Sequence, residues 1–156
     1  MKEYGPDDLQ KLIREVVEQA QKLSDKYVGG AAGKVTYACI FAQNQKEYEL
    51  LTRSAGLLGS VIKNTPTGPL FNIAPLDTVA GRLKLLKIRL PDKTRPERGD
   101  ADFAVKDYSA FKKSCISRPG FKLIVRETSE MIELMDPDFN VRVYFSNPPV
   151  DKQYGL

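Results

Sequence analysis

The sequence predicts an α/β protein with a mixed central sheet flanked by helices. Three observations support this fold class. An amphipathic pattern opens the chain at residues 6 to 27, an apolar stretch at 34 to 42 switches into a helical pattern, and short strand-like runs follow residue 120. With 156 residues, the chain fits a single domain, 1–156, with a sizeable core.

The sequence contains no histidine, and this restricts the available chemistry. Ser-His-Asp catalysis, Cys-His catalysis and every metal site that uses imidazole are excluded. The two cysteines, Cys39 and Cys115, have no metal-ligand or redox spacing. Catalysis would therefore use carboxylates, lysines, arginines, hydroxyls, backbone amides or a hard metal such as Mg²⁺.

The charge and hydropathy patterns indicate a soluble protein with an anionic ligand. The net charge of +4 and the pI near 9.0 suit an anion but do not single out nucleic acid. No run approaches the ~20 apolar residues that a membrane span needs. The N-terminus is polar and acidic, so we expect no secretory signal and a cytoplasmic location.

Residues 6 to 27 predict an amphipathic helix within the N-terminal segment 1–28. Pro6 suits the first helical position, and the two aspartates that follow favour the positive end of the helix dipole. We expect the apolar stripe of this helix to cover the sheet or a partner subunit. The glycine-rich run 29–34 precedes a strand rather than a helix, so it predicts a connector and not a phosphate-binding loop.

The stretch from 34 to 59 is the predicted centre of the fold. Residues 34 to 42 are β-branched, aromatic and apolar, which predicts a strand covered on both faces, with Cys39 as a small buried hydrophobe. Residues 44 to 58 then show the three-to-four-residue apolar spacing of a helix. The chain therefore passes from a buried strand through a short polar turn into a helix.

The turn at residues 43–46 is a candidate anion site. The first amides of a helix lack internal partners and carry the positive end of its dipole, so they can receive a phosphate group. Asn44 adds an amide donor there, and Lys46 adds a positive charge. The sequence therefore predicts that Asn44 and Lys46 contact an anionic ligand.

Two short strands, 60 to 63 and 70 to 73, are predicted after this helix, with a turn-rich loop between them. Thr65 and Thr67 in that loop are candidate pocket residues, although turn chemistry alone also explains them. A further helix is predicted from a cap at Asp77 or Thr78 to Leu90, because apolar residues recur there at helical spacing. We expect its basic residues to form a solvated face.

The segment from 91 to 99 is the most polar part of the chain. Its two prolines predict a loop that can move. Lys93, Arg95 and Arg98 are the residues best able to hold phosphate, because a guanidinium group binds phosphate oxygens in bidentate fashion. An ordinary solvated loop is an equally good interpretation of this pattern.

Asp100 and Asp102 stand at the start of a predicted strand. Their i, i+2 spacing points both carboxylates to the same side of an extended chain, where they can share one hard cation. The spacing therefore predicts a candidate hard-cation site at this pair. The alternative is that both acids accept hydrogen bonds from nearby backbone amides.

The C-terminal part predicts a short helix at 107 to 115, followed by three strands at 121–126, 130–135 and 141–146. Turn residues separate these strands, which favours an antiparallel meander. The segment 147–156 is expected to be a loose tail or to dock on a partner. The sequence shows no internal repeat.

Residues 41 to 49, Phe-Ala-Gln-Asn-Gln-Lys-Glu-Tyr-Glu, resemble the opening strand-turn-helix of the inosine triphosphate pyrophosphatase-like fold. In that superfamily the turn carries Thr/Ser-x-Asn-x-x-Lys. Here Ala42 replaces the hydroxyl residue, and Lys46 comes one position early. Over most of its length the chain is similar to an archaeal branch, the HcgB-type guanylyltransferases of [Fe]-hydrogenase cofactor biosynthesis in methanogens, through segments 40–49, 65–69 and 98–105.

This resemblance implies a nucleotide-binding homodimer that transfers GMP from GTP to the hydroxyl of a pyridinol precursor, with release of pyrophosphate. In this hypothesis Asn44, Lys46, Thr65 and Thr67 bind the nucleotide, Arg95 or Arg98 closes over the phosphates, and Asp100 and Asp102 hold Mg²⁺. Lys46 and Asp102 are the proposed catalytic residues. Such transfer depends on positioning and charge neutralisation, so it needs no histidine.

Three other functions fit the same residues. The first is a nucleoside triphosphate pyrophosphatase, in which water replaces the pyridinol. The second is a non-catalytic nucleotide- or nucleic-acid-binding protein, although the basic residues alternate with acids and no array of exposed aromatics is evident. The third is a scaffold protein with a decayed nucleotide site, which the missing hydroxyl at Ala42 favours.

Overall fold

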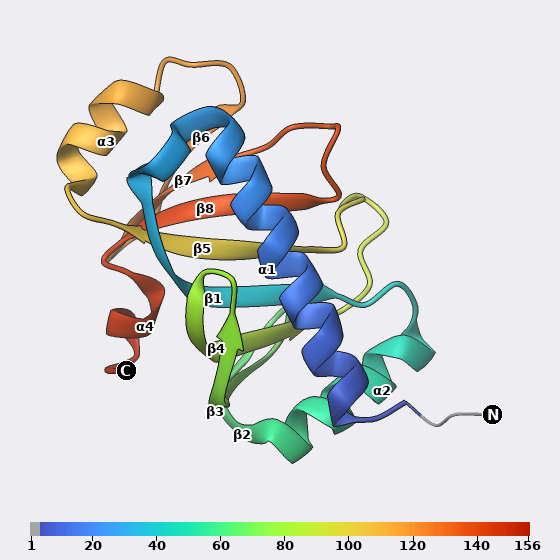
Figure 1. Cartoon of the computed structure of the whole chain (residues 1–156). Coiled ribbons are helices and arrows are strands. Elements are labelled where there is room, and N and C mark those ends of the chain that lie inside the picture. The colour runs from blue at the N-terminus through green and yellow to red at the C-terminus, as the bar shows by residue number, and fades with distance from the viewer. Residues whose placement is uncertain (1–3) are drawn as a thin grey trace.

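The computed structural model describes residues 4–156, which form an eight-stranded mixed sheet with three helices on one face (Figure 1). The strand order is β2-β3-β4-β1-β5-β8-β7-β6. The α/β class and the mixed sheet are as predicted. The strands are β1 (Ala32–Phe41), β2 (Gly59–Thr65), β3 (Gly68–Thr78), β4 (Gly81–Arg89), β5 (Gly99–Val105), β6 (Phe121–Val125), β7 (Glu130–Leu134) and β8 (Val141–Asn147). The helices are α1 (Pro6–Val28), α2 (Gln45–Leu58), α3 (Tyr108–Cys115) and α4 (Val150–Gln153), with a 3₁₀ turn, η1 (Gly29–Ala31).

The topology consists of the same β-α-β-β-β unit twice. The first unit is β1-α2-β2-β3-β4, and the second is β5-α3-β6-β7-β8. In each unit the first strand pairs in parallel with the last, and the antiparallel pairing of β1 with β5 joins the two units. The absence of a repeat in the sequence was therefore misleading for the fold, because the duplication lies in strand order and not in residue identity.

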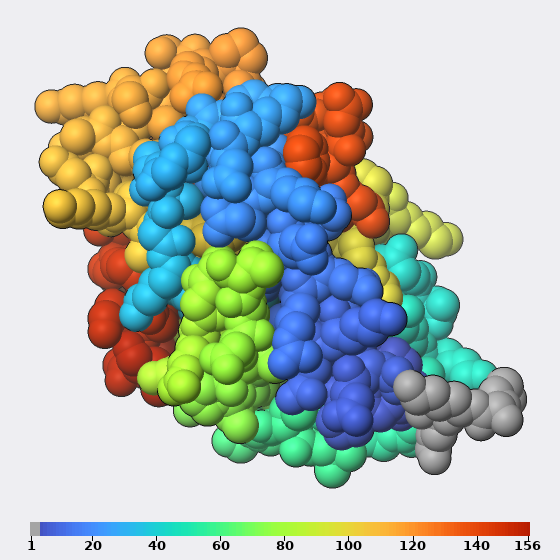
Figure 2. Space-filling model, viewed as in Figure 1, coloured from blue at the N-terminus to red at the C-terminus, as the bar shows by residue number. Residues whose placement is uncertain are grey.

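Helix α1 covers the sheet diagonally (Figures 1 and 2). Its apolar stripe is buried as predicted, with Leu9, Ile13 and Leu23 all fully buried. The helix begins after Gly5, whose amide donates to a carboxylate oxygen of Asp8 at 2.9 Å. Burial of each such side chain contributes about 1.5–3 kcal/mol, so this packing fixes α1 on one face of the sheet.

Alternate residues of strand β1 face opposite sides of the sheet. Ala38 and Ile40 are fully buried in the core beneath α1, whereas Tyr37, two residues before Cys39, is only partly buried on the opposite face. The expectation that this strand is covered on both faces is therefore only partly met. The face that carries Tyr37 borders a cavity.

The predicted helix from 77 to 90 is wrong, because this segment forms the end of β3 and the whole of β4. A tight turn joins the two strands. Thr78 Oγ1 accepts from the Ala80 amide at 3.1 Å and donates to the Gly81 carbonyl at 2.6 Å, and Gly81 adopts φ +103°. Short apolar runs fit both helical and strand periods, and here sheet pairing decides between them.

The second unit agrees with the predicted pattern. Asp107 caps α3 by accepting a hydrogen bond from the Ala110 amide at 3.1 Å, and Phe111 of α3 packs on Phe145 with 4.6 Å between ring centroids. Strands β6, β7 and β8 pair antiparallel in chain order. The segment expected to be a loose tail contains α4, which contacts β1. No helix among residues 4–156 is both long and apolar enough to span a membrane.

Candidate functional site

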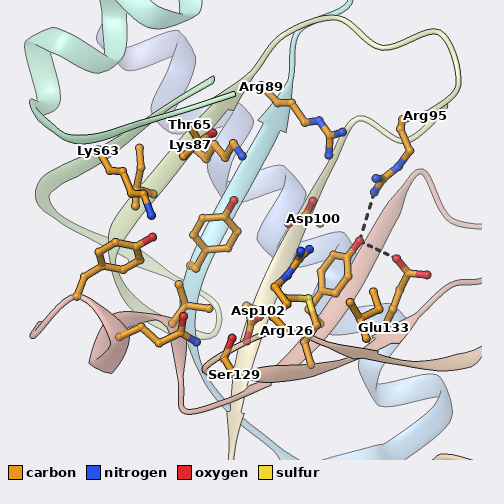
Figure 3. Close-up of a pocket in the computed structure, with 18 residues that line it drawn as sticks. Lys63, Thr65, Lys87, Arg89, Arg95, Asp100, Asp102, Arg126, Ser129 and Glu133 are labelled. Carbon is orange, nitrogen blue, oxygen red and sulfur yellow. Dashed lines mark hydrogen bonds between the residues drawn. The ribbon is translucent and has the colours of Figure 1, made fainter. Parts of the chain in front are cut away.

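A cavity of about 450 Å³ opens on the sheet face opposite α1 (Figure 3). Both β-α-β-β-β units contribute to its floor and walls, and the C-terminal segment supplies Val150, Gln153 and Tyr154. Its volume lies in the range typical of small-molecule sites, about 300–1,000 Å³. Its polar lining is rich in charge: Lys63, Lys87, Arg89, Arg95, Arg126, Asp100, Asp102 and Glu133.

A hydrogen-bonded row of six strands sets the order of side chains across the cavity. Along the strand order from β2 to β8, the paired residues are Lys63, Leu70, Lys87, Cys39, Asp100 and Arg142. Neighbouring strands lie ~4.8 Å apart, so the backbones of Lys87 and Asp100 are separated by roughly 10 Å. Because paired residues share a face, the register places a basic group on each side of the Asp100 carboxyl.

Lys63 and Lys87, the lysine pair, form one end of the cavity. Among residues 4–156, no carboxylate lies within ion-pair distance of either amine. Lys87 Nζ donates to Thr67 Oγ1 at 2.5 Å, and Lys63 Nζ lies 6.0 Å from the centre of the Tyr154 ring. Burial, with the nearby Arg89, lowers the pKa of Lys87. The lysine pair therefore carries positive charge that the protein does not neutralise.

Arg89 and Arg95, the arginine pair, lie at the other end over the ring of Phe41. The guanidinium carbons are 4.7 Å and 5.2 Å from the ring centre. Arg95 Nη2 also contacts Glu97 Oε2 at 2.6 Å and donates to the Tyr144 hydroxyl at 3.2 Å. Stacking and hydrogen bonding together fix the orientation of a guanidinium fork. The arginine pair is thus positioned before any ligand binds.

A ring of charged side chains supports Arg95. Buried Glu97 accepts from Arg95 at 2.6 Å and from Arg142 at 2.8 Å through the same oxygen. Arg142 also contacts Glu133, at 3.3 Å, and Tyr144 donates to Glu133 at 2.8 Å. The ring closes through the hydrogen bond from Arg95 to Tyr144. It anchors the arginine end of the cavity to β7 and β8.

Asp100 and Asp102 point to the same side of β5, as their spacing predicts, and both are buried there at the cavity. Burial raises the pKa of Asp100 to about 7 and that of Asp102 to about 8. Ser146 donates to Asp102 through both its amide and its hydroxyl, whereas no residue among 4–156 hydrogen-bonds the Asp100 carboxyl. Asp100 can therefore exchange a proton with a ligand near neutral pH.

The cavity brings together four of the predicted site residues: Thr65, Arg95, Asp100 and Asp102. Thr67 is adjacent, as the acceptor for Lys87. Arg98 points elsewhere, because its Nη1 lies 2.5 Å from Glu47 Oε1.

The turn residues Asn44 and Lys46 are apart from this cavity. The Asn44 side chain caps α2 by accepting from the Glu47 amide at 2.8 Å, and Glu47 accepts in turn from the Gln43 amide at 2.9 Å. Asn44 borders a second cavity of about 480 Å³, together with Arg95, while Lys46 is exposed at the start of α2. The turn therefore does not line the cavity that contains Asp100 and Asp102, although Arg95 lines both cavities.

Several residues that line the cavity were not predicted from the sequence to belong to a site. Lys87 and Arg89 fall in the segment assigned to a helix, where they were expected to be solvated. Tyr37, Tyr144 and Glu133 lie in strands that were treated as packing elements. The available signal was polar residues at alternate positions of otherwise apolar strands, which marks a sheet face that is not packed in the core.

No protein-family model and no curated protein matches this sequence. A solved structure described as "Structural Genomics, Protein EC4020" is similar, with a TM-score of 0.63 over 90% of this chain and 86% of that chain. The two sequences are 12% identical. This similarity shows a shared fold.

Proposed function

We propose that the cavity binds a small anionic molecule and catalyses proton transfer on it, with Asp100 as the general acid or base. One observation carries this proposal: a single cavity combines the unpaired lysine pair with a buried carboxyl group that lacks a protein partner. Clefts that combine perturbed carboxyl groups with fixed cations are typical of active sites.

The charge balance of the cavity favours an anion. Five basic residues line it, against three acidic ones. Two of these acids, Asp100 and Asp102, have pKa values raised to about 7 and about 8, so they are largely uncharged below neutral pH. The surplus positive charge lies in a partly enclosed space, where electrostatic interactions are stronger than in bulk water.

The same cations support chemistry at Asp100. A carboxyl group whose pKa lies near the working pH can both donate and accept a proton. When it removes a proton from carbon or oxygen, negative charge develops on the substrate, and Lys87 and the arginine pair are placed to stabilise that charge. Asp102 is held by Ser146, so it fixes the neighbouring strand in place and takes no part in the proton transfer.

Guanylyl transfer on an inosine triphosphate pyrophosphatase-like fold is the second candidate. It is favoured by the presence of Thr65, Arg95, Asp100 and Asp102 in one cavity. Mg²⁺ fits this cavity only in part, because residues 4–156 hold no cluster of three or more acidic or cysteine ligands. The metal would have to be shared between these carboxylates and nucleotide phosphates, which is a common mode of Mg²⁺ binding.

Anion binding is tested by titrating the protein calorimetrically with sulfate and with inorganic phosphate. Lys87→Gln is expected to weaken binding roughly 10-fold or more, because it removes a charge-assisted contact. Lys84→Gln is the matched control, since Lys84 is exposed on the same strand. Equal affinities in the wild type and the Lys87 variant would contradict the proposed site.

Catalysis is tested by incubating the protein in D₂O with a panel of small carboxylated and phosphorylated carbonyl compounds, while following C–H signals by proton NMR. Proton transfer appears as exchange of a substrate C–H for deuterium, and Asp100→Asn should abolish it. A parallel incubation with GTP and Mg²⁺, with and without a hydroxypyridine acceptor, tests the second candidate. Release of pyrophosphate that depends on the acceptor would favour guanylyl transfer, and size-exclusion chromatography tests the homodimer that this candidate implies.

A further inference from the structure

We propose that the ligand of this cavity carries an anionic group at each end, one held by the lysine pair and the other by the arginine pair, with Asp100 facing the segment between them. This inference rests on the proposed function, because it specifies the substrate class of the same site. Figure 3 shows Lys63 and Lys87 on one side of the cavity, Arg89 and Arg95 on the other, and Asp100 between the two pairs.

The lysine end is built to receive an anion. Lys63 comes from β2 and Lys87 from β4, so two strands present amines to one space. Neither amine has a carboxylate partner among residues 4–156. The hydroxyl of Thr65, which also lines this end, donates to the Gly68 carbonyl at 2.7 Å and so is held in place. An anionic group of the ligand would supply the missing counter-charge.

The arginine end offers a different kind of contact. The two guanidinium groups are stacked on Phe41, and Glu97 binds Arg95 through Nε and Nη2 only. Arg95 Nη1 therefore has no hydrogen-bond partner among residues 4–156. Because Nη2 already contacts Glu97 and Tyr144, Arg95 offers Nη1 to a ligand, while Arg89 is held by a partly exposed ion pair with Asp92 at 3.4 Å. Two fixed guanidinium groups over the same ring can together hold the oxygens of one carboxylate or phosphate.

The outer members of the two pairs lie on different strands. Lys63 is on β2, and Arg95 lies over the ring of Phe41 on β1, three strand positions away. At ~4.8 Å per strand, these two strands are separated by roughly 14 Å, whereas the inner members, Lys87 and Arg89, lie two residues apart on β4. A ligand that reaches both Lys63 and Arg95 is therefore several bonds long. Asp100 lies on β5, the strand next to β1.

The test is a calorimetric comparison of alkane-α,ω-bisphosphonates with alkyl monophosphonates of the same carbon number, from two to six carbons. Linking two anionic groups at the correct spacing makes the second contact intramolecular, so one bisphosphonate should bind roughly 100-fold more tightly than its monophosphonate. Lys63→Gln and Arg89→Gln should each remove this gain. Lys63 is exposed, and Arg89→Gln loses only a long, partly exposed ion pair with Asp92 at 3.4 Å, so both variants should fold.

The outcomes separate this inference from the proposed function. Equal binding of mono- and bisphosphonates at every length would overturn the two-ended ligand but leave anion binding intact. A gain that survives in either variant would also overturn it, because the second group would then be held elsewhere. Failure of every phosphonate to bind would remove the proposed function as well. The same series with α,ω-dicarboxylates shows whether carboxylate or phosphate ends are preferred, and Lys84→Gln should behave as the wild type.

Discussion

The turn at residues 43–47 and the cavity on the open sheet face both contain several polar side chains. Those of the turn are hydrogen-bonded or ion-paired with other protein groups, whereas several charged groups in the cavity have no such partner. In the turn, Asn44 accepts from the Glu47 amide, and Glu47 pairs with Arg98 and with the Gln43 amide. In the cavity, among residues 4–156, the lysine pair has no carboxylate partner and the Asp100 carboxyl accepts no hydrogen bond. Unmet charge, rather than the type of residue, distinguishes the candidate site from a structural motif.

The largest expected effect concerns Asp100 and the pH dependence of stability. In the unfolded chain this carboxyl ionises near its usual pKa of 3.8, whereas in the folded protein burial raises its pKa to about 7. The folded state therefore binds the proton more tightly, and the unfolding free energy falls as pH rises from about 4 to about 7. The loss is up to about 4 kcal/mol for a shift of this size.

Asp100→Asn should remove this dependence. Urea denaturation of the wild type and the variant at pH 4.5 and 7.5 measures it, and only the difference between the two proteins is needed, because groups that do not interact with Asp100 titrate equally in both. The variant is expected to be more stable than the wild type at pH 7.5 and similar at pH 4.5. A difference that does not change with pH would mean that burial does not raise the pKa of Asp100.

The next largest effect on stability is expected at the ring of side chains around Arg95. Glu97→Gln leaves Arg95 without a carboxylate partner and Arg142 with only its longer contact to Glu133, at 3.3 Å, and we expect a loss of about 3 kcal/mol in unfolding free energy. Asp77→Asn is the matched control, because it removes an ion pair of similar length, 3.2 Å, between side chains that are 73% and 80% exposed. That change should cost less than about 1 kcal/mol. Equal losses in the two variants would contradict a buried, charge-supporting role for Glu97.

The smallest effect is expected in the turn. Asn44→Ala removes the cap of α2 and should lower the unfolding free energy by about 1 kcal/mol. Sulfate affinity should change less than twofold, since the Asn44 side chain serves the helix and borders a different cavity. Thermal denaturation and calorimetric titration of the same sample measure both quantities. A clear loss of sulfate affinity with unchanged stability would show that the turn, and not the sheet face, binds the anion.

Periodic features of the sequence predicted much of the fold. The stripe of α1 and the i, i+2 spacing of Asp100 and Asp102 each follow from local geometry, and the structure shows both. The segment containing Lys87 was misassigned because its leucines fit a helix as well as a strand, and only pairing with β1 and β3 determines the outcome. That error hid the lysine pair.

The candidate site was harder to predict than the fold, because the same residue types serve both structure and binding. Asn44 has the chemistry of a helix cap and of a phosphate contact, and its neighbours in space decide which role it takes. Arg95 and Arg98 lie in one loop, yet the first lines the cavity and the second pairs with Glu47. Such choices depend on long-range packing, which a single sequence does not reveal.

The most direct test of the account is a titration of ¹⁵N-labelled protein with sulfate, followed by amide chemical-shift mapping. The predicted result is saturable shifts at Thr65, Lys87 and Asp100, with little change at residues 43 to 47. Saturable shifts confined to residues 43 to 47, with the open sheet face unaffected, would contradict the claim that unmet charge on that face forms the binding site.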